Sequence, residues 1–331
     1  MSLPTLPVEL IDNILQNVQA PDLAALALTC ISLSPVAQRL LYRDITVSAW
    51  SHNTKVVATL AKRPDLAIFV RSFSITTTTQ PLVFAAFHRL LATALSSMTE
   101  LTALSLNLAD SSTSWILEKA AQFSYNRLHQ FTASFPLDQN VVNFLEKTPN
   151  LIELEVDSIR CPEPASPVAT LLSTTIPHLA QFVGSVRAAK MIVPGRPLES
   201  IHLSEGDLVY EDVADFSRAT GRVLVFSATA STPPVPLLES VAHCLPHLAY
   251  LRIMTTYQFT QAPKPGFMDQ VANALATLPD LTAFELSGMQ WGSSKREDDS
   301  SKRVWQSAPL TTAFIRPDDA IIDAEEVFLQ Y

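Results

Sequence analysis

The apolar residues of the chain follow one spacing before about residue 42 and a different spacing after it. In the first part, Leu6, Leu10 and Ile14 recur every four residues, and Ile11 and Leu15 lie beside them. This spacing places all five residues on one broad side of a helix. The pattern therefore predicts an amphipathic helix at the start of the chain.

Two further short helices follow from helix-start signals. Pro21 opens a segment whose apolar side includes Leu23 and Leu26. Ser34 followed by Pro35 is a typical start of a third helix, because serine caps orphan N–H groups and proline suits the first turn. Residues 6–41 therefore predict three short helices with tight connections.

The rest of the chain repeats a template of three apolar residues at positions 1, 4 and 6. The copies recur at a mean interval of about 27 residues, within the period of leucine-rich repeats. The first positions of the clear copies are Tyr42, Val70, Leu101, Leu128, Leu151, Leu198, Leu248 and Leu281, and weaker copies start at Leu179, Gly221 and Leu310.

Helical segments separate these short strands, as in 82–95, 139–146 and 237–243. Several of them end at a proline before the next strand, as in Leu278-Pro279-Asp280-Leu281. A strand, a helix and a proline-marked return form one turn of a solenoid. The expected fold class is α/β: a helical domain over residues 1–45, then a solenoid of parallel strands with outer helices over residues 46–331.

The composition of the chain argues against several classes of protein. The formal net charge of −9 disfavours nucleic-acid binding. The basic residues at 295–303 are mixed with acids and predict a solvated loop. No stretch has the length of a membrane span. The start has no secretory signal, so the three cysteines are expected to be mostly buried, reduced thiols and the protein to be cytoplasmic or nuclear.

Catalytic chemistry has little support in the sequence. Only seven glycines occur, and none forms a phosphate loop or a nucleophile turn. His243, Cys244 and His247 are potential zinc ligands, but they lack a second pair nearby, and His247 occupies the turn position held elsewhere by Asn150 and Asp280. We therefore expect neither a catalytic site, nor a metal site, nor a cofactor.

The N-terminal residues Leu6-Pro7-Val8-Glu9-Leu10-Ile11-Asp12-Asn13-Ile14-Leu15 resemble the opening of an F-box. The segments 22–30 and 39–43 are similar to the middle and the end of that motif in fungal F-box proteins. Leu33 lies near the place where many F-boxes carry a tryptophan. The array that follows resembles the degenerate leucine-rich repeats found after many fungal F-boxes, without the asparagine or cysteine of the repeat signature.

The resemblance implies an adaptor that performs no chemistry itself. The F-box would dock onto a Skp-family linker of a cullin–RING ubiquitin ligase, and the repeats would bind an unknown target protein. The residues implied in contact with the linker are Leu6, Pro7, Leu10, Ile11, Ile14, Leu15, Leu23 and Leu26. The alternative is a repeat scaffold whose N-terminal helix caps the solenoid and which has no ligase role.

Residues that alternate with the buried positions of each strand should face outward on the concave side of the solenoid. Aromatic and arginine side chains often dominate binding, which makes Tyr250 and Arg252 candidate anchors. His202 is a further candidate, and the segment 153–157 is a candidate acidic patch. The candidates for target recognition are thus Glu153, Glu155, Asp157, His202, Tyr250 and Arg252; the alternative is that they are ordinary solvent-facing residues.

Overall fold

The chain forms an open, mostly parallel α/β sheet flanked by helices. The computed structural model describes residues 7–48, 53–77, 85–157, 171–255, 265–287, 289–296 and 299–307. Within them, twelve strands form one sheet in sequence order, parallel up to the tenth strand. The strands are β1 (Asp44–Ser48), β2 (Ser72–Thr76), β3 (Ala103–Asn107), β4 (Gln130–Ala133), β5 (Glu153–Val156), β6 (Gln181–Ser185), β7 (Ser200–Glu205), β8 (Val225–Ala230), β9 (Tyr250–Thr255), β10 (Ala283–Leu286), β11 (Met289–Arg296) and β12 (Asp299–Ser307).

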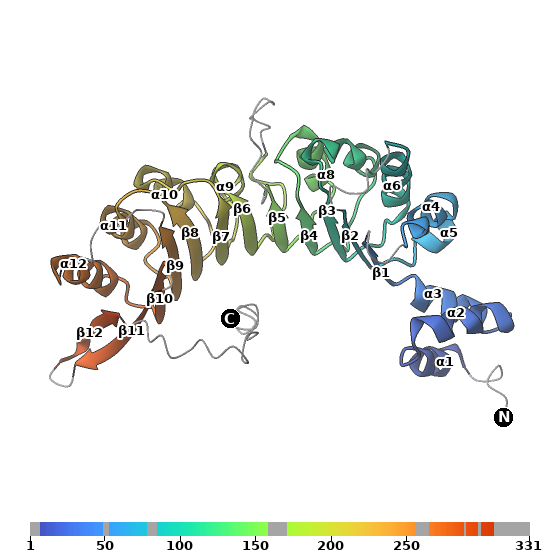
Figure 1. The fold of residues 1–331 in the computed structure, drawn as a ribbon, viewed down its shortest axis with the longest axis horizontal. Helices are drawn as coiled ribbons and strands as arrows, with labels where there is room; N and C mark the ends of the chain where they lie inside the picture. Colours follow the sequence, from blue (N-terminus) through green and yellow to red (C-terminus); the bar gives the residue numbers. More distant parts are fainter. Residues whose placement is uncertain are drawn as a thin grey trace.

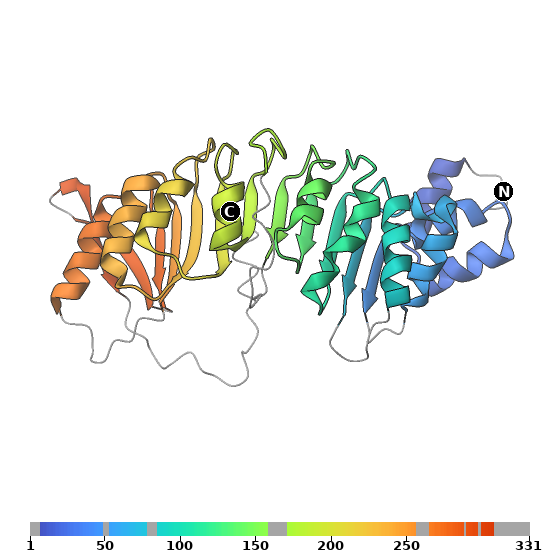
Figure 2. The same ribbon diagram turned by 90° about the horizontal axis from the view of Figure 1, so that it is seen from above.

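The sheet bends into an arc with strands on its inner side and helices on its outer side (Figure 1). Figure 2, seen from above, shows the helices as a row along the convex face. A solenoid-like α/β architecture, as expected, is therefore confirmed. The outer elements are α4 (Lys55–Lys62), α5 (Pro64–Ala67), α6 (Ala85–Ser97), η2 (Ser111–Ile116), α7 (Leu117–Ala120), α8 (Gln139–Leu145), α9 (Val186–Ile192), η3 (Tyr210–Asp212), α10 (Val213–Phe216), α11 (Pro234–Cys244) and α12 (Pro265–Ala276).

The buried residues of successive strands stand in register and form one continuous core. Phe73 lies beside Leu104, which lies beside Phe131, and all three are almost fully buried. One predicted repeat is displaced: the buried residues that match the template around β8 are Val223 just before the strand and Phe226 and Ala228 within it, so the template starts two residues after Gly221. The sequence favoured the wrong copy because Leu224 and Phe226 are larger apolar residues than Ala228, which marks a core position only weakly.

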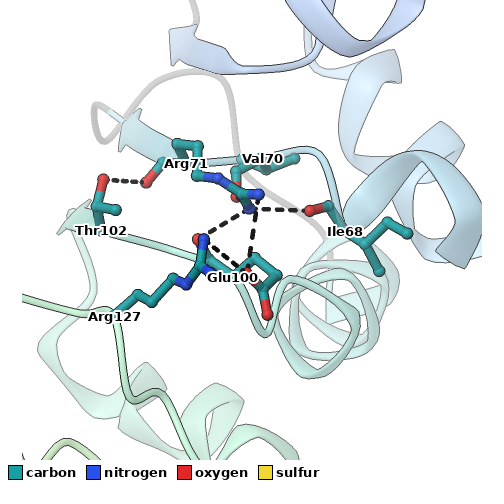
Figure 3. A network of polar contacts seen from close by, with 6 residues as sticks. All are labelled: Ile68, Val70, Arg71, Glu100, Thr102 and Arg127. Atoms are coloured by element: carbon teal, nitrogen blue, oxygen red, sulfur yellow. Dashed lines mark hydrogen bonds and ion pairs between the residues drawn. The ribbon is translucent and has the colours of Figure 1, made fainter. Parts of the chain in front are cut away.

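The corners before the strands are joined by polar contacts between neighbouring repeats (Figure 3). Arg71 Nη1 donates to the carbonyl oxygens of Ile68 and Glu100 at 3.0 and 3.1 Å. The Glu100 carboxylate lies 3.3 Å from Arg127 Nη1 in the following corner. These contacts satisfy carbonyls at the turns, where the backbone has no partner in the sheet.

The C-terminal end of the described sheet departs from the repeat pattern. β10 pairs antiparallel with β11, and β11 with β12. The basic residues expected in a loop lie instead in these two strands, where Lys295 stands opposite Arg303. Trp291 and Trp305 are buried and cover the open end of the core. This role was not predicted from the sequence, because most residues of the hairpin are polar. The weak copy at Leu310 lies outside the described residues.

Three helices precede the sheet: α1 (Val8–Leu15), α2 (Ala20–Thr29) and α3 (Ser34–Leu41). They share a small core of their own, separate from the core of the solenoid. Asp12 on α1 accepts a 2.6 Å bond from Arg39 on α3. β1 already pairs with β2, so Ile45 belongs to the larger core.

Candidate partner-binding surfaces

The helix α1 presents an apolar ridge to solvent. Leu10 and Ile14 stand one helical turn apart, and each side chain is 48% exposed. Pro7, just before the helix, is exposed as well. Leu6 lies outside the described residues. The ridge exists because the apolar stripe of α1 is wider than its two short neighbours can cover.

Three of the residues expected at the linker interface lie inside the module instead. Ile11, Leu15 and Leu23 are between 2% and 6% exposed and pack together in its small core. Leu26 is half-buried against the same core. A short module needs its own core before it can offer a surface, so these four residues support the ridge rather than form it.

Two nearly bare apolar side chains were not predicted. Leu28 is 89% exposed near the end of α2, and Ile31 in the following turn is 94% exposed. Both line a shallow groove of about 440 Å³ between α2, α3 and α5, together with Phe69. The available signal was that Leu28 lies off the apolar side of the predicted second helix, which includes Leu23 and Leu26. Exposed apolar residues gathered in one region are typical of interaction sites.

On the concave face, β9 and β10 bring two of the candidates, Tyr250 and Arg252, into contact with Glu285. Arg252 Nε lies 3.5 Å from Glu285 Oε2, and the Tyr250 hydroxyl donates to the same oxygen at 3.4 Å. The parallel register places Arg252 directly beside Glu285. Burial, followed by the nearby Glu285 carboxylate, raises the pKa of Tyr250. The phenol therefore stays protonated and acts as a donor.

His202 lies in the same row of outward residues, two strands from Arg252. Its Nε2 lies 2.9 Å from the hydroxyl of Ser200 on the same strand. Burial, and to a lesser extent the positive charge of Arg252, lower the pKa of His202. The imidazole is therefore neutral at physiological pH and can exchange a hydrogen bond without carrying charge.

Two residues of the expected acidic patch lie on β5, and the third follows directly after it. Glu153 and Glu155 share the outward face of β5 and are partly exposed. Asp157 lies beyond the end of β5 in a left-handed conformation, with φ at 57°. Its carboxylate accepts a hydrogen bond from Ser185, the residue that caps α9. Burial raises the pKa of Asp157. Its carboxylate is engaged with Ser185, but the residue is partly exposed like Glu153 and Glu155, so it stays a candidate for recognition.

The potential zinc ligands lie at the end of α11 and in the corner that follows it. His247 lies 3.2 Å from Asp280 in the next corner, which Arg222 also contacts at 2.8 Å. Hydrogen bonds from His247 and Arg222 lower the pKa of Asp280. His247 is therefore a turn residue, as its position suggested. Within the described residues, no three histidine, cysteine or acidic side chains gather in a way that could hold a metal ion.

Comparison with known proteins does not assign the chain to a family. No family model matches the chain, and a search of curated proteins finds no match either. Among the described helices, none has both the length and the apolar character needed to cross a membrane.

Proposed function

We propose that the chain is a substrate-recognition adaptor of a cullin–RING ubiquitin ligase. In this proposal α1–α3 form an F-box that docks onto a Skp-family linker, and the sheet is a leucine-rich-repeat-like solenoid that binds a target protein. The adaptor contributes no chemistry of its own; it brings the target close to the ligase. The resemblance of residues 6–43 to the F-box motif is the starting point.

The observation that carries the proposal is a self-contained helical module with an uncovered apolar ridge. Ile11 and Leu15 already fill the module's core, yet Leu10 and Ile14 remain about half exposed beside them. Fully burying a leucine or isoleucine contributes about 1.5–3 kcal/mol, so covering the exposed halves of two such residues favours association by about 2 kcal/mol. Val8 on α1 is exposed as well, and Leu28 and Ile31 form a second exposed apolar pair beside the groove at α3 and α5.

The competing scaffold hypothesis predicts a different packing for the three N-terminal helices. If these helices only capped the solenoid, their apolar residues would pack over the first repeat, near Ile45 and Val57. Instead the buried residues of the module form a separate cluster, and Leu10 and Ile14 face solvent. The geometry favours docking to a second protein over capping.

A pull-down with a purified Skp-family linker tests the proposal. The parent chain should retain the linker at micromolar concentration, and the double variant Leu10→Asp/Ile14→Asp should not, because it buries two charges in the interface. A matched control is Phe123→Asp/Ile152→Asp, which places the same charges at solenoid residues of similar exposure, 44% and 40%. Circular dichroism checks that each variant is folded.

The outcomes separate the two hypotheses. Loss of binding in the α1 variant alone supports the adaptor. Absence of binding by the folded parent chain would rule out the ligase role and leave the scaffold hypothesis. Equal loss in both double variants would also count against the ridge, because the effect would then not depend on α1.

A further inference from the structure

We propose that the concave face binds an extended target segment that carries lysine or arginine side chains. The inference rests on the proposed function, which assigns target binding to this face, and it adds the chemical class of the target. The face runs along the inner side of the arc in Figure 1, from β1 to β10. Its outward residues define what it can attract.

The outward positions of the parallel strands carry a net negative charge. Among the described residues, the carboxylates are Asp44, Glu153, Glu155 and Glu285, against one guanidinium, that of Arg252. The remaining outward positions hold mainly serine, threonine, alanine and glutamine. A face of this kind attracts basic segments and repels acidic ones.

The positive charge on this face is already neutralised. Arg252 lies 3.5 Å from Glu285, which leaves little attraction for an acidic partner. His202 is neutral at physiological pH for the reasons given above. Asp44 on β1 lies 3.9 Å from Arg43, so the outward carboxylates that remain without an ion pair among the described residues are those of β5.

Glu153 and Glu155 lie in the middle of the face, and their partners on the adjacent strands are uncharged. Glu153 stands between Gln130 and Gln181 in the register, and Glu155 stands beside Val183. Among the described residues, neither glutamate takes part in an ion pair within 4.0 Å. Arg252 is four strands away, about 19 Å at the spacing of neighbouring strands, which exceeds the screening length of about 8 Å.

The same face offers an aromatic contact to a basic segment. Tyr250 is partly exposed on β9, on the same side of the sheet as Glu153. A lysine or arginine over the face of a tyrosine ring gains about 0.5–1 kcal/mol at an exposed site. An extended chain advances about 3.4 Å per residue, so about six residues reach from β5 to β9. One short basic segment can therefore contact both glutamates and the tyrosine.

A peptide titration with the full chain tests the inference. The probes are two fluorescent peptides of about ten residues, one alternating lysine with alanine and one alternating glutamate with alanine. The parent chain should bind the lysine peptide and not the glutamate peptide. Glu153→Gln/Glu155→Gln should weaken lysine-peptide binding about fivefold, because two exposed ion pairs are lost. The matched control Glu146→Gln/Glu239→Gln removes the same charge from exposed residues on the helix side and should change the affinity less than about twofold.

Equal weakening in both variants would overturn the inference, because the attraction would then come from net charge alone. No binding of the lysine peptide by the parent chain would overturn it as well, as would tighter binding of the glutamate peptide. The linker pull-down, repeated with the Glu153/Glu155 variant, distinguishes this inference from the proposed function. Linker binding should be unchanged there, and its absence in the parent would count against the adaptor role and not against the titration.

Discussion

Replacing the buried Arg196 should destabilise the solenoid strongly. Its side chain is 0% exposed, and its described hydrogen-bond partners are all backbone carbonyls. Nη2 donates to Leu172 at 2.7 Å and Nε donates to Thr175 at 3.0 Å, while Nη1 donates to Ile192 near the end of α9. The guanidinium thus ties the segment before β6 to the end of α9.

The size of the effect follows from these contacts. Hydrogen bonds from a charged donor contribute about 1.5–3 kcal/mol each, so three of them stabilise the fold by about 5–9 kcal/mol. Burial lowers the pKa of Arg196 to about 10, a depression that corresponds to a cost of about 3 kcal/mol for burying the charge. For Arg196→Met, which removes both the bonds and the buried charge, we expect a net loss of about 2–6 kcal/mol.

Thermal and urea unfolding followed by circular dichroism measure this loss. A loss of about 4 kcal/mol corresponds to a fall of about 8–16 °C in Tm for a domain of this size. Arg218→Met is the control, because Arg218 is exposed in the neighbouring loop and should change stability by less than about 0.5 kcal/mol. Arg196→Lys should fall between the two, since one ammonium cannot reach all three carbonyls. A Tm change below about 2 °C for Arg196→Met would show that these hydrogen bonds do not stabilise the fold as calculated.

Three further predictions concern the core and the concave face. Gly184→Ala should cost about 1–3 kcal/mol in urea unfolding, because an added Cβ would lie 2.2 Å from the carbonyl oxygen of Val156. Tyr125→Phe should cost about 1 kcal/mol in the same assay, because the buried hydroxyl donates to Leu95 O at 2.9 Å; no change would show that the bond contributes nothing net. The folded-state pKa of His202 is lowered, so its contribution to stability is full above its unfolded pKa of about 6.5 and is lost as the pH falls through the folded value. His202→Gln should therefore reduce the loss of urea stability between about pH 7.5 and pH 5.5, and an unchanged pH profile would contradict this assignment.

Much of the fold could be predicted from local patterns. The alternation of buried and outward residues in β3 or β9 is visible as apolar residues two apart, because each strand exposes alternate side chains to the core. The displaced copy in β8 and the strands β11 and β12 could not be predicted in this way. Ala228 is too small to mark a core position, and the hairpin consists largely of polar residues around two tryptophans.

The residues of the candidate surfaces could be identified from the sequence, but which of them are exposed could not. The stripe of α1 identified Leu10 and Ile14 together with Ile11 and Leu15, but only the packing of α3 decides which pair is buried. Likewise Asp157 continues the alternation of β5 in sequence, yet a positive φ turns it toward Ser185.

Local patterns were sufficient to predict the repeat, the parallel α/β architecture and a separate helical start, because the spacing of apolar residues reflects which side of each element is buried. Contacts between residues far apart in the chain could be identified only from the folded structure. Tyr250 and Arg252 meet Glu285 because consecutive repeats stack in register, and Arg196 closes on Leu172 across a turn of the solenoid. Such contacts depend on how neighbouring repeats stack, which the spacing within a single repeat does not specify.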